Sequence, residues 1–198
     1  MRFFQLASYM AMVVATATIS LVSYTQAAQF VGCTADQQNQ INNAVVAATN
    51  YVGNAYNYMV NPPSDSTDER YITWFGAEEN QRRAFVTSVL NNLNNNDFTT
   101  FTYDCITCTN PTLLAYVYPD QFGIMYLCAI FWNINATGAN SQGGTIVSQA
   151  SQFLNNGGTQ NHEYGEDDCQ ELARTKPQDA ITNAENYEFF AENDPPLN

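Results

Sequence analysis

The hydrophobic periodicity of this chain changes twice, which limits the architectures open to it. Apolar residues first recur at helical spacing and end before Pro62-Pro63, namely Ile41, Val45, Ala48, Val52, Tyr56 and Met59. Thr34-Ala35-Asp36-Gln37 has the form of a capping box, so we expect the first helix to begin there. A second helix is predicted over residues 80–93, and the Asn-rich tract 91–96 ends it.

The pattern then shifts from helical to strand-like and back. Short aromatic and β-branched runs at 98–103, 114–118 and 124–131 are separated by Pro- and Gly-containing turns, which is typical of a small sheet. Helices are predicted again at 145–155, 168–175 and 177–193, the last with Pro177 in its first turn. We therefore predict a single α+β domain, mostly helical, with the helices before and after a small sheet.

Residues 1–27 read as a signal peptide, which leaves residues 28–198 as the predicted domain. Arg2 supplies the positive start, an apolar run follows, and Thr25-Gln26-Ala27 resembles a cleavage site for signal peptidase. The alternative is a membrane anchor, but hydroxyl residues interrupt the run, and it is short for a span. We expect a secreted, extracellular product.

The charge of the chain excludes some partners. Its formal net charge is −13, with 19 acidic side chains against six basic ones. Nucleic acids and anionic membrane surfaces both require clustered positive charge, so neither is an expected partner. A cationic partner fits the charge, and so does solubility alone.

Five cysteines in a secreted chain predict disulfides and one thiol left over. Cys105-Ile106-Thr107-Cys108 also spells the C-x-x-C of redox and zinc sites, but no second such pair completes a zinc cage. Cys169 is the odd cysteine, either a buried thiol or the handle of a covalent dimer. Asn135-Ala136-Thr137 is a glycosylation sequon in a predicted loop.

Several segments, in this order, resemble the deuterolysin (aspzincin) family of secreted fungal zinc peptidases, above all its peptidyl-lysine branch. They are Arg70–Gly76, Tyr103–Cys105, Ala115–Pro119, Phe122–Cys128, Ser141–Val147, Gly157–Thr159 and Asn183–Phe190. The resemblance runs from about Gly32 to the C-terminus. It implies a zincin-like fold, and it implies that Cys33 pairs with Cys105 and Cys108 with Cys128.

The resemblance implies zinc, yet the metal-binding residues are absent. The family binds Zn²⁺ through the two His of His-Glu-x-x-His and the Asp of a downstream Gly-Thr-x-Asp-Tyr. Here the three ligand positions are Ser148, Gln152 and Asn161, and Gln149 stands where the motif has its catalytic Glu. Tight zinc binding needs imidazole or deprotonated ligands, and an amide at 149 accepts no proton near neutral pH. We therefore expect no cofactor and no peptidase activity.

Other positions of the family's site are retained. Tyr164 matches the tyrosine that stabilises the transition state in the family, and Glu185 and Glu188 match the acids that receive a lysine side chain. Three residues apart on a helix, the two acids would point to the same side. The plain alternative is a solvated helix face in an acidic protein.

Three functions remain open on the sequence. The first is a catalytically inactive, secreted homologue that binds a basic or lysine-containing polypeptide in the old substrate cleft. The second is an enzyme with a relocated site, either a metal held by His162 and its acidic neighbours or a nucleophilic Ser148 or Ser151 paired with His162. These neighbours are Glu163, Glu166, Asp167 and Asp168. The third is an extracellular structural or storage protein.

Overall fold

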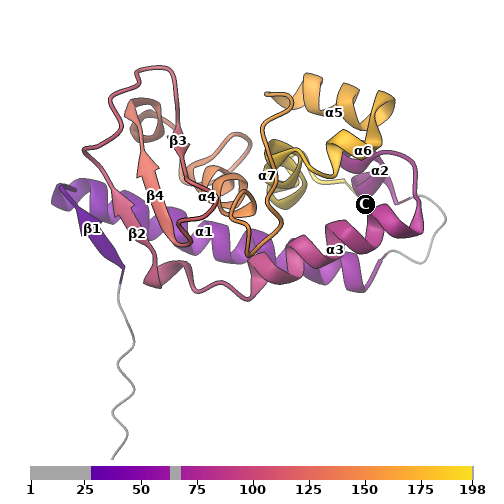
Figure 1. Cartoon of the computed structure of the whole chain (residues 1–198), viewed down its shortest axis with the longest axis horizontal. Helices are drawn as coiled ribbons and strands as arrows, with labels where there is room; N and C mark the ends of the chain where they lie inside the picture. Colours follow the sequence, from indigo (N-terminus) through magenta and orange to yellow (C-terminus); the bar gives the residue numbers. More distant parts are fainter. Residues whose placement is uncertain (1–27, 63–67, 198) are drawn as a thin grey trace, which may run out of the picture.

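The computed structural model describes residues 28–62 and 68–197 (Figure 1). The predicted signal peptide, residues 1–27, lies outside the described residues. Two long helices, α1 (Ala35–Val60) and α3 (Asn80–Asn94), pack together along the length of the molecule. Among the described residues, none of the helices has both the length and the apolarity that a membrane crossing requires.

The first helix begins and ends as the sequence predicts. The Thr34 hydroxyl accepts a hydrogen bond from the Gln37 N–H at 3.2 Å, and the Gln37 side chain accepts from the Thr34 N–H at 2.9 Å. These reciprocal bonds satisfy backbone donors that the helix itself leaves free. The helix ends at Val60, two residues before Pro62.

A small mixed sheet occupies one end of the molecule. Its strands lie in the order β1 (Gln29–Val31), β2 (Thr102–Asp104), β4 (Ile124–Leu127) and β3 (Ala115–Tyr116). The first three are mutually parallel, and β3 pairs antiparallel with β4 as an edge strand.

Both disulfides implied by the family resemblance are present at this end of the molecule. Cys33–Cys105 joins the residues that follow β1 and β2, and Cys108–Cys128 joins the next loop to the end of β4. In the chain-entropy account, the first bridge stabilises the fold by about 4 kcal/mol and the second by about 3 kcal/mol.

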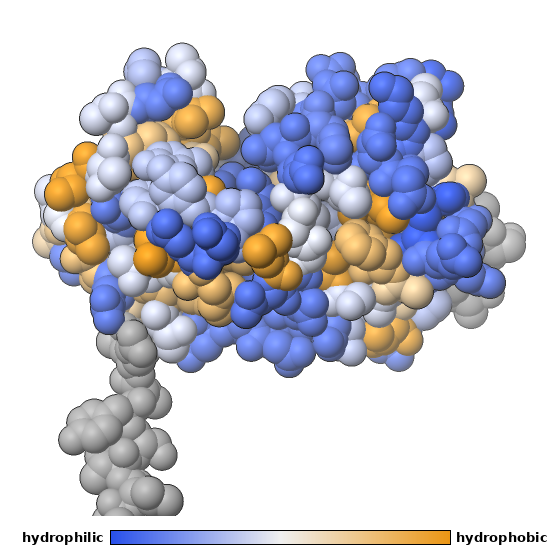
Figure 2. Space-filling model, in the orientation of Figure 1, coloured by the Kyte–Doolittle hydropathy of each residue, from blue (hydrophilic) through white to orange (hydrophobic). Residues whose placement is uncertain are grey.

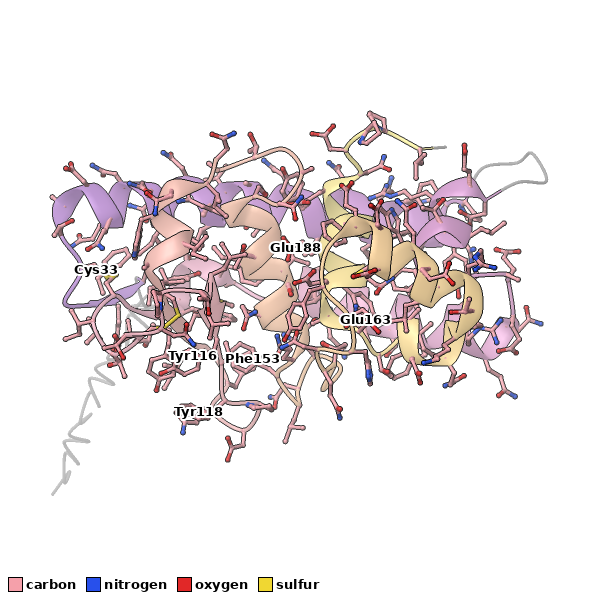
Figure 3. The ribbon with its side chains drawn as sticks, turned by 90° about the horizontal axis from the view of Figure 1, so that it is seen from above. Cys33, Tyr116, Tyr118, Phe153, Glu163 and Glu188 are labelled. Atoms are coloured by element: carbon pink, nitrogen blue, oxygen red, sulfur yellow. A yellow bond between two sulfur atoms is a disulfide. The ribbon has the colours of Figure 1, made fainter. Side chains whose placement is uncertain are left out.

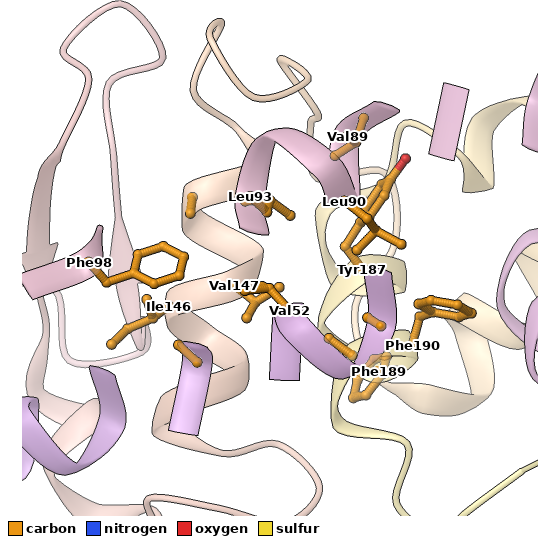
Figure 4. Close-up of a cluster of buried hydrophobic side chains, with 14 of the residues drawn as sticks. Val52, Val89, Leu90, Leu93, Phe98, Ile146, Val147, Tyr187, Phe189 and Phe190 are labelled. Atoms are coloured by element: carbon orange, nitrogen blue, oxygen red, sulfur yellow. The ribbon is translucent and has the colours of Figure 1, made fainter. Parts of the chain in front are cut away.

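The remaining helices build the core and the far end. They are α2 (Glu69–Phe75), α4 (Gln142–Ser151), α5 (Glu166–Thr175), α6 (Pro177–Ala180) and α7 (Ala184–Glu192). The apolar faces of α1, α3, α4 and α7 meet in one cluster, where Val52, Leu90, Val147 and Phe190 are at most 1% exposed (Figure 4). The mostly helical α+β architecture agrees with the prediction.

Two predicted strands are partly helical. The 98–103 run forms a 3₁₀ turn, η1 (Phe98–Thr100), before β2, and the 124–131 run leaves the sheet after Leu127 and turns into η2 (Ala129–Asn133). The Asp97 carboxylate accepts the Thr99 N–H at 3.0 Å, which favours the turn over an extended chain. The strand β1 and the helix α2 were not predicted, because each is too short to show a period.

Two predicted helices also have different bounds. The helix predicted at 145–155 runs from Gln142 to Ser151, since Ser141 caps it and accepts the Gly144 N–H at 3.0 Å. The helix predicted at 177–193 is two helices, α6 and α7, because Asn183 is extended and forms a bridge with Gln160. This break helps to position the loop that follows α4.

A substitution at Gly143 tests the tight crossing of α1 and α4. A Cβ at this position would lie 2.7 Å from the Cβ of Ala47 and 3.1 Å from the ring of Tyr51. We expect Gly143→Ala to lower the free energy of unfolding by about 1–2 kcal/mol in urea titrations, because the crossing is overpacked.

Gly53→Ala is the matched control, because its Cβ would first meet Asn94 at 3.6 Å. It should be neutral or stabilise by up to about 1 kcal/mol, since alanine favours the helix. If both substitutions changed the free energy of unfolding equally, α1 and α4 would not be in close contact at Gly143.

Candidate functional site

A cleft of about 650 Å³ lies between the edge of the sheet and the C-terminal helices. The space-filling view is indented at this place (Figure 2), and the view from above shows Glu188 between the sheet side with Tyr116 and the side with Glu163 (Figure 3). The cleft is lined by Thr112, Leu113, Leu114, Ala115, Tyr116, Val117, Thr145, Ser148, Gln149, Gln152, Asn161, Tyr164, Glu185 and Glu188. The lining contains every position that the sequence analysis matched to the family's metal, base and lysine-binding residues.

The polar side of α4 forms one wall of the cleft. Ser148, Gln149 and Gln152 lie on this wall, whereas Ile146 and Val147 of the same helix are fully buried in the core. Residues four apart share a helix face, so Ser148 and Gln152 stand one turn apart on the cleft side. They occupy the spacing that two metal-binding histidines would need.

The chain after α4 folds back against the end of that helix. The Thr159 N–H donates to the Ser151 carbonyl at 3.2 Å, and the Ser151 and Thr159 hydroxyls are 2.6 Å apart. Gln160 then pairs with the segment before α7, since its N–H donates to the Thr182 carbonyl at 2.8 Å. The next residue, Asn161, is thereby fixed at the cleft across from α4.

A buried asparagine holds the rest of this loop. The side-chain oxygen of Asn183 accepts the backbone N–H of His162 at 2.7 Å. Its side-chain nitrogen donates to the Glu163 backbone carbonyl at 3.2 Å and to the Asn186 side-chain oxygen at 2.7 Å. Asn183 is fully buried, so these bonds replace the water it has lost. The loop thus brings Tyr164, which is 59% exposed, to the rim of the cleft.

The acids of α7 face the cleft rather than bulk solvent, so the alternative of a solvated helix face does not apply. Glu188 is only 4% exposed, and Glu185 is half-buried and accepts the Gly165 N–H at 2.7 Å. Burial raises the pKa of both carboxyl groups, and for Glu188 the charges of Glu192 and Glu185 add to the rise. The cleft lining within the described residues contains no Lys or Arg to offset these charges.

A third carboxylate, which the sequence analysis did not single out, lies behind the other two. Glu192 is 8% exposed and accepts hydrogen bonds from the Ser141 N–H and hydroxyl and from the Asn140 N–H, at 2.7–2.9 Å. Burial nevertheless raises the pKa of Glu192 to about 7. Its four-residue spacing from Glu188, which places both acids on one face of a helix, was the signal available in the sequence.

The donor atoms at the family's metal position do not fit zinc. A hydroxyl and two neutral amides stand there, and Zn²⁺ prefers thiolate, imidazole and carboxylate ligands. Glu185 and Glu188 are the nearby carboxylates, without an imidazole in the cleft lining to complete a set. These residues therefore provide no zinc site of the family's kind, and no reaction step is derived through a metal.

Two relocated sites that the sequence left open, a metal at His162 and the pair of Ser151 with His162, are not formed in the described part of the chain. His162 and its acidic neighbours do not gather as a group of three or more potential metal ligands. The His162 ring contacts the Thr182 hydroxyl at 3.0 Å, whereas the Ser151 hydroxyl donates to the Ser148 carbonyl and pairs with Thr159. Ser151 and His162 thus have other partners and form no nucleophile–base pair.

The structure decides the state of Cys169 and places the sequon. Cys169 is unpaired in this chain, fully buried and within 3.3 Å of the Asn183 side-chain amide, which is the position of a core thiol. Burial raises its pKa, which makes the thiol less reactive. Asn135 is exposed, as a glycosylated residue must be.

The fold and the cleft define a zincin-like peptidase scaffold, and the comparisons identify its family. The chain belongs to the lysine-specific metallo-endopeptidase family, whose model matches residues 60–192. It is 43% identical over 170 residues to the peptidyl-Lys metalloendopeptidase of Pleurotus ostreatus, covering 86% of this chain and 99% of that protein.

Two further comparisons agree. The peptidyl-Lys metalloendopeptidase of Armillaria mellea is 42% identical over 164 residues, which are 83% of this chain and 46% of that protein, so this chain spans about half of that relative. The solved zinc peptidase from Grifola frondosa superposes with a TM-score of 0.79 at 39% identity, covering 84% of this chain and 100% of that one. The zincin-like fold expected from the sequence is therefore confirmed.

The buried acids make stability depend on pH. The pKa of Glu192 is about 7 in the folded chain against an ordinary value of 4.5, so the folded state holds the proton more tightly. This contribution is complete below about pH 4.5 and is lost as the pH rises through 7, a change of about 3 kcal/mol. Glu192→Gln should remove this decline, which falls between about pH 4.5 and pH 7, in urea titrations.

Other carboxylates with a lowered pKa, such as Asp104, change stability with pH in the opposite direction. The effect of Glu192 is therefore isolated by comparing, between variants, the slope of the free energy of unfolding against pH. Glu171→Gln, an exposed residue on α5, is the matched control and should leave the wild-type slope unchanged. A slope that Glu192→Gln also leaves unchanged would contradict the assignment.

Proposed function

We propose that this chain is a secreted, catalytically inactive member of its family that binds lysine-containing polypeptides in the cleft without cleaving them. The observation that carries the proposal is a cleft that keeps the family's acids for binding lysine but has other residues at the positions of the metal ligands. The acids Glu185 and Glu188 are retained in its lining, whereas the metal positions hold Ser148, Gln152 and Asn161.

The absence of hydrolysis follows from the chemistry of these groups. A zinc peptidase needs a metal to polarise the peptide carbonyl and a carboxylate base to activate water. Gln149 is an amide where that base would stand, and amides take up no proton near neutral pH. Without the base and all three metal ligands, the cleft can neither polarise the peptide carbonyl nor activate water, even though Tyr164 is retained.

The binding of lysine is supported by charge and by burial. A protonated lysine side chain entering the cleft would meet two carboxylates, of which Glu188 is nearly fully buried and not balanced by a cation in the lining. Charge-assisted hydrogen bonds in such a place are strong. The net charge of −13 also favours the approach of a cationic polypeptide.

Secretion is supported by the predicted signal peptide and by the disulfides. Two structural disulfides form readily in the oxidising secretory pathway and persist outside the cell.

A peptide-binding measurement tests the proposed function. We expect acetyl-Ala-Ala-Lys-Ala-Ala-amide to bind in isothermal titration calorimetry at about pH 8 and to remain intact on mass spectrometry. The same peptide with norleucine in place of lysine should bind at least about tenfold more weakly, because it lacks the ammonium group.

Glu188→Gln should weaken binding of the lysine peptide by a similar factor and leave the norleucine peptide unaffected. Glu171→Gln on α5 is the matched control, as it lies outside the cleft. Equal affinity for the lysine and norleucine peptides would sink the proposal of lysine recognition, and cleavage of the peptide would sink the proposal of inactivity.

Restoring the family's residues tests the inferred loss of the site. The quadruple variant Ser148→His, Gln149→Glu, Gln152→His and Asn161→Asp should bind about one Zn²⁺ per chain and cleave lysine-containing peptides. The reason is that helix α4 and the loop at Asn161 already present these positions to one cleft.

The triple variant without Asn161→Asp is the control, and it should bind zinc more weakly because it supplies one ligand fewer. A quadruple variant that folds, as judged by circular dichroism, but takes up no zinc would show that the assignment of positions is wrong.

A further inference from the structure

One buried donor in the cleft has no partner. Gln152 is 8% exposed, it belongs to the cleft lining, and its side-chain amide nitrogen has no hydrogen-bond partner among the residues that the structure describes. Buried polar atoms are nearly always paired, and an unpaired one destabilises the fold. This donor is therefore a candidate for pairing with a group from outside the chain.

The surroundings of Gln152 restrict the chemistry of that group. Gln149 and Asn161 add two more side-chain amides to the same lining, and each amide offers both a donor and an acceptor. Glu185 and Glu188 lie in the same cleft, so an anionic ligand would be repelled. A neutral carbonyl flanked by an N–H group, as in a polypeptide backbone, satisfies both conditions.

The geometry of the side chain allows this contact. The terminal torsion of glutamine is broad, so the amide can turn its N–H towards the cleft without moving the helix. Gln152 follows Ser148 by one helical turn, and it is the last residue of this face before the chain bends away at Phe153. Gln152 thus belongs to the α4 wall of the cleft, while the acids come from α7.

We infer that the Gln152 amide donates a hydrogen bond to a backbone carbonyl of the bound polypeptide, one residue of which inserts its basic side chain between Glu185 and Glu188. This inference rests on the proposed function and adds the group that holds the ligand's main chain. A neutral hydrogen bond then orients the ligand carbonyl in the cleft and leaves its peptide bond intact.

The test compares Gln152→Met with the wild type, because methionine has a similar length and no donor. The probe is acetyl-Ala-Ala-Lys-Ala-Ala-amide in calorimetry at about pH 8. We expect roughly three- to tenfold weaker binding, the usual effect of one neutral hydrogen bond. We also expect an unchanged or higher Tm, since the variant no longer buries an unpaired donor. A merely structural glutamine would give the opposite change in Tm.

A second probe identifies the carbonyl. In a series of this peptide, each backbone amide in turn is replaced by an E-alkene isostere, which lacks the carbonyl oxygen. One member should lose affinity for the wild type and show no further loss with Gln152→Met, because both changes remove the same bond. Gln160→Met, an exposed glutamine outside the lining, is the matched control and should bind like the wild type.

The outcomes separate this inference from the proposed function. If the wild type does not bind the peptide, both are overturned. If the wild type binds, and Gln152→Met binds equally well or loses affinity only together with a lower Tm, the inference alone is overturned.

Discussion

The close approach of α7 to α4 determines the geometry of the cleft. Gly144 makes it possible, because a side chain there would collide with both Glu188 and Glu192. Glu192 reaches past this glycine to the backbone N–H groups of Asn140 and Ser141, at the start of α4. The helix is thereby held with Ser148 and Gln152 towards the cleft and the acids of α7 beside them. The polar wall on α4 and the acidic wall on α7 are therefore held together by the packing of these two helices.

This arrangement leaves the negative charges of the cleft without a balancing positive charge among the residues described there. The described cleft lining contains two carboxylates and no basic side chain, and burial raises the pKa of both groups. Protonation is one way to remove the charge, and a lysine ammonium from a ligand is the other. The proposed function corresponds to the second way, since neutral amides at the family's metal positions can hydrogen-bond a polypeptide main chain without attacking it. Loss of hydrolysis and retention of binding are then physically compatible in one cleft.

The sequence predicted what depends on long periods and on the family resemblance. The helices α1 and α3 and the small sheet follow from periodicity, and the disulfide pairing came from the resemblance alone. The features that the sequence did not reveal depend on single contacts between residues far apart in the chain. Glu192 reads as one acid among 19, and only its bonds to the start of α4 reveal it. The break at Asn183 is invisible locally, because the bridge to Gln160 causes it.

The most direct test of the central claim is the metal content of the protein, purified from a eukaryotic secretion host and dialysed against trace zinc. The account predicts no stoichiometric zinc by elemental analysis, because a hydroxyl and neutral amides occupy the family's ligand positions. About one tightly held zinc per chain would contradict it, since a peptidase-like metal site would then exist despite these substitutions.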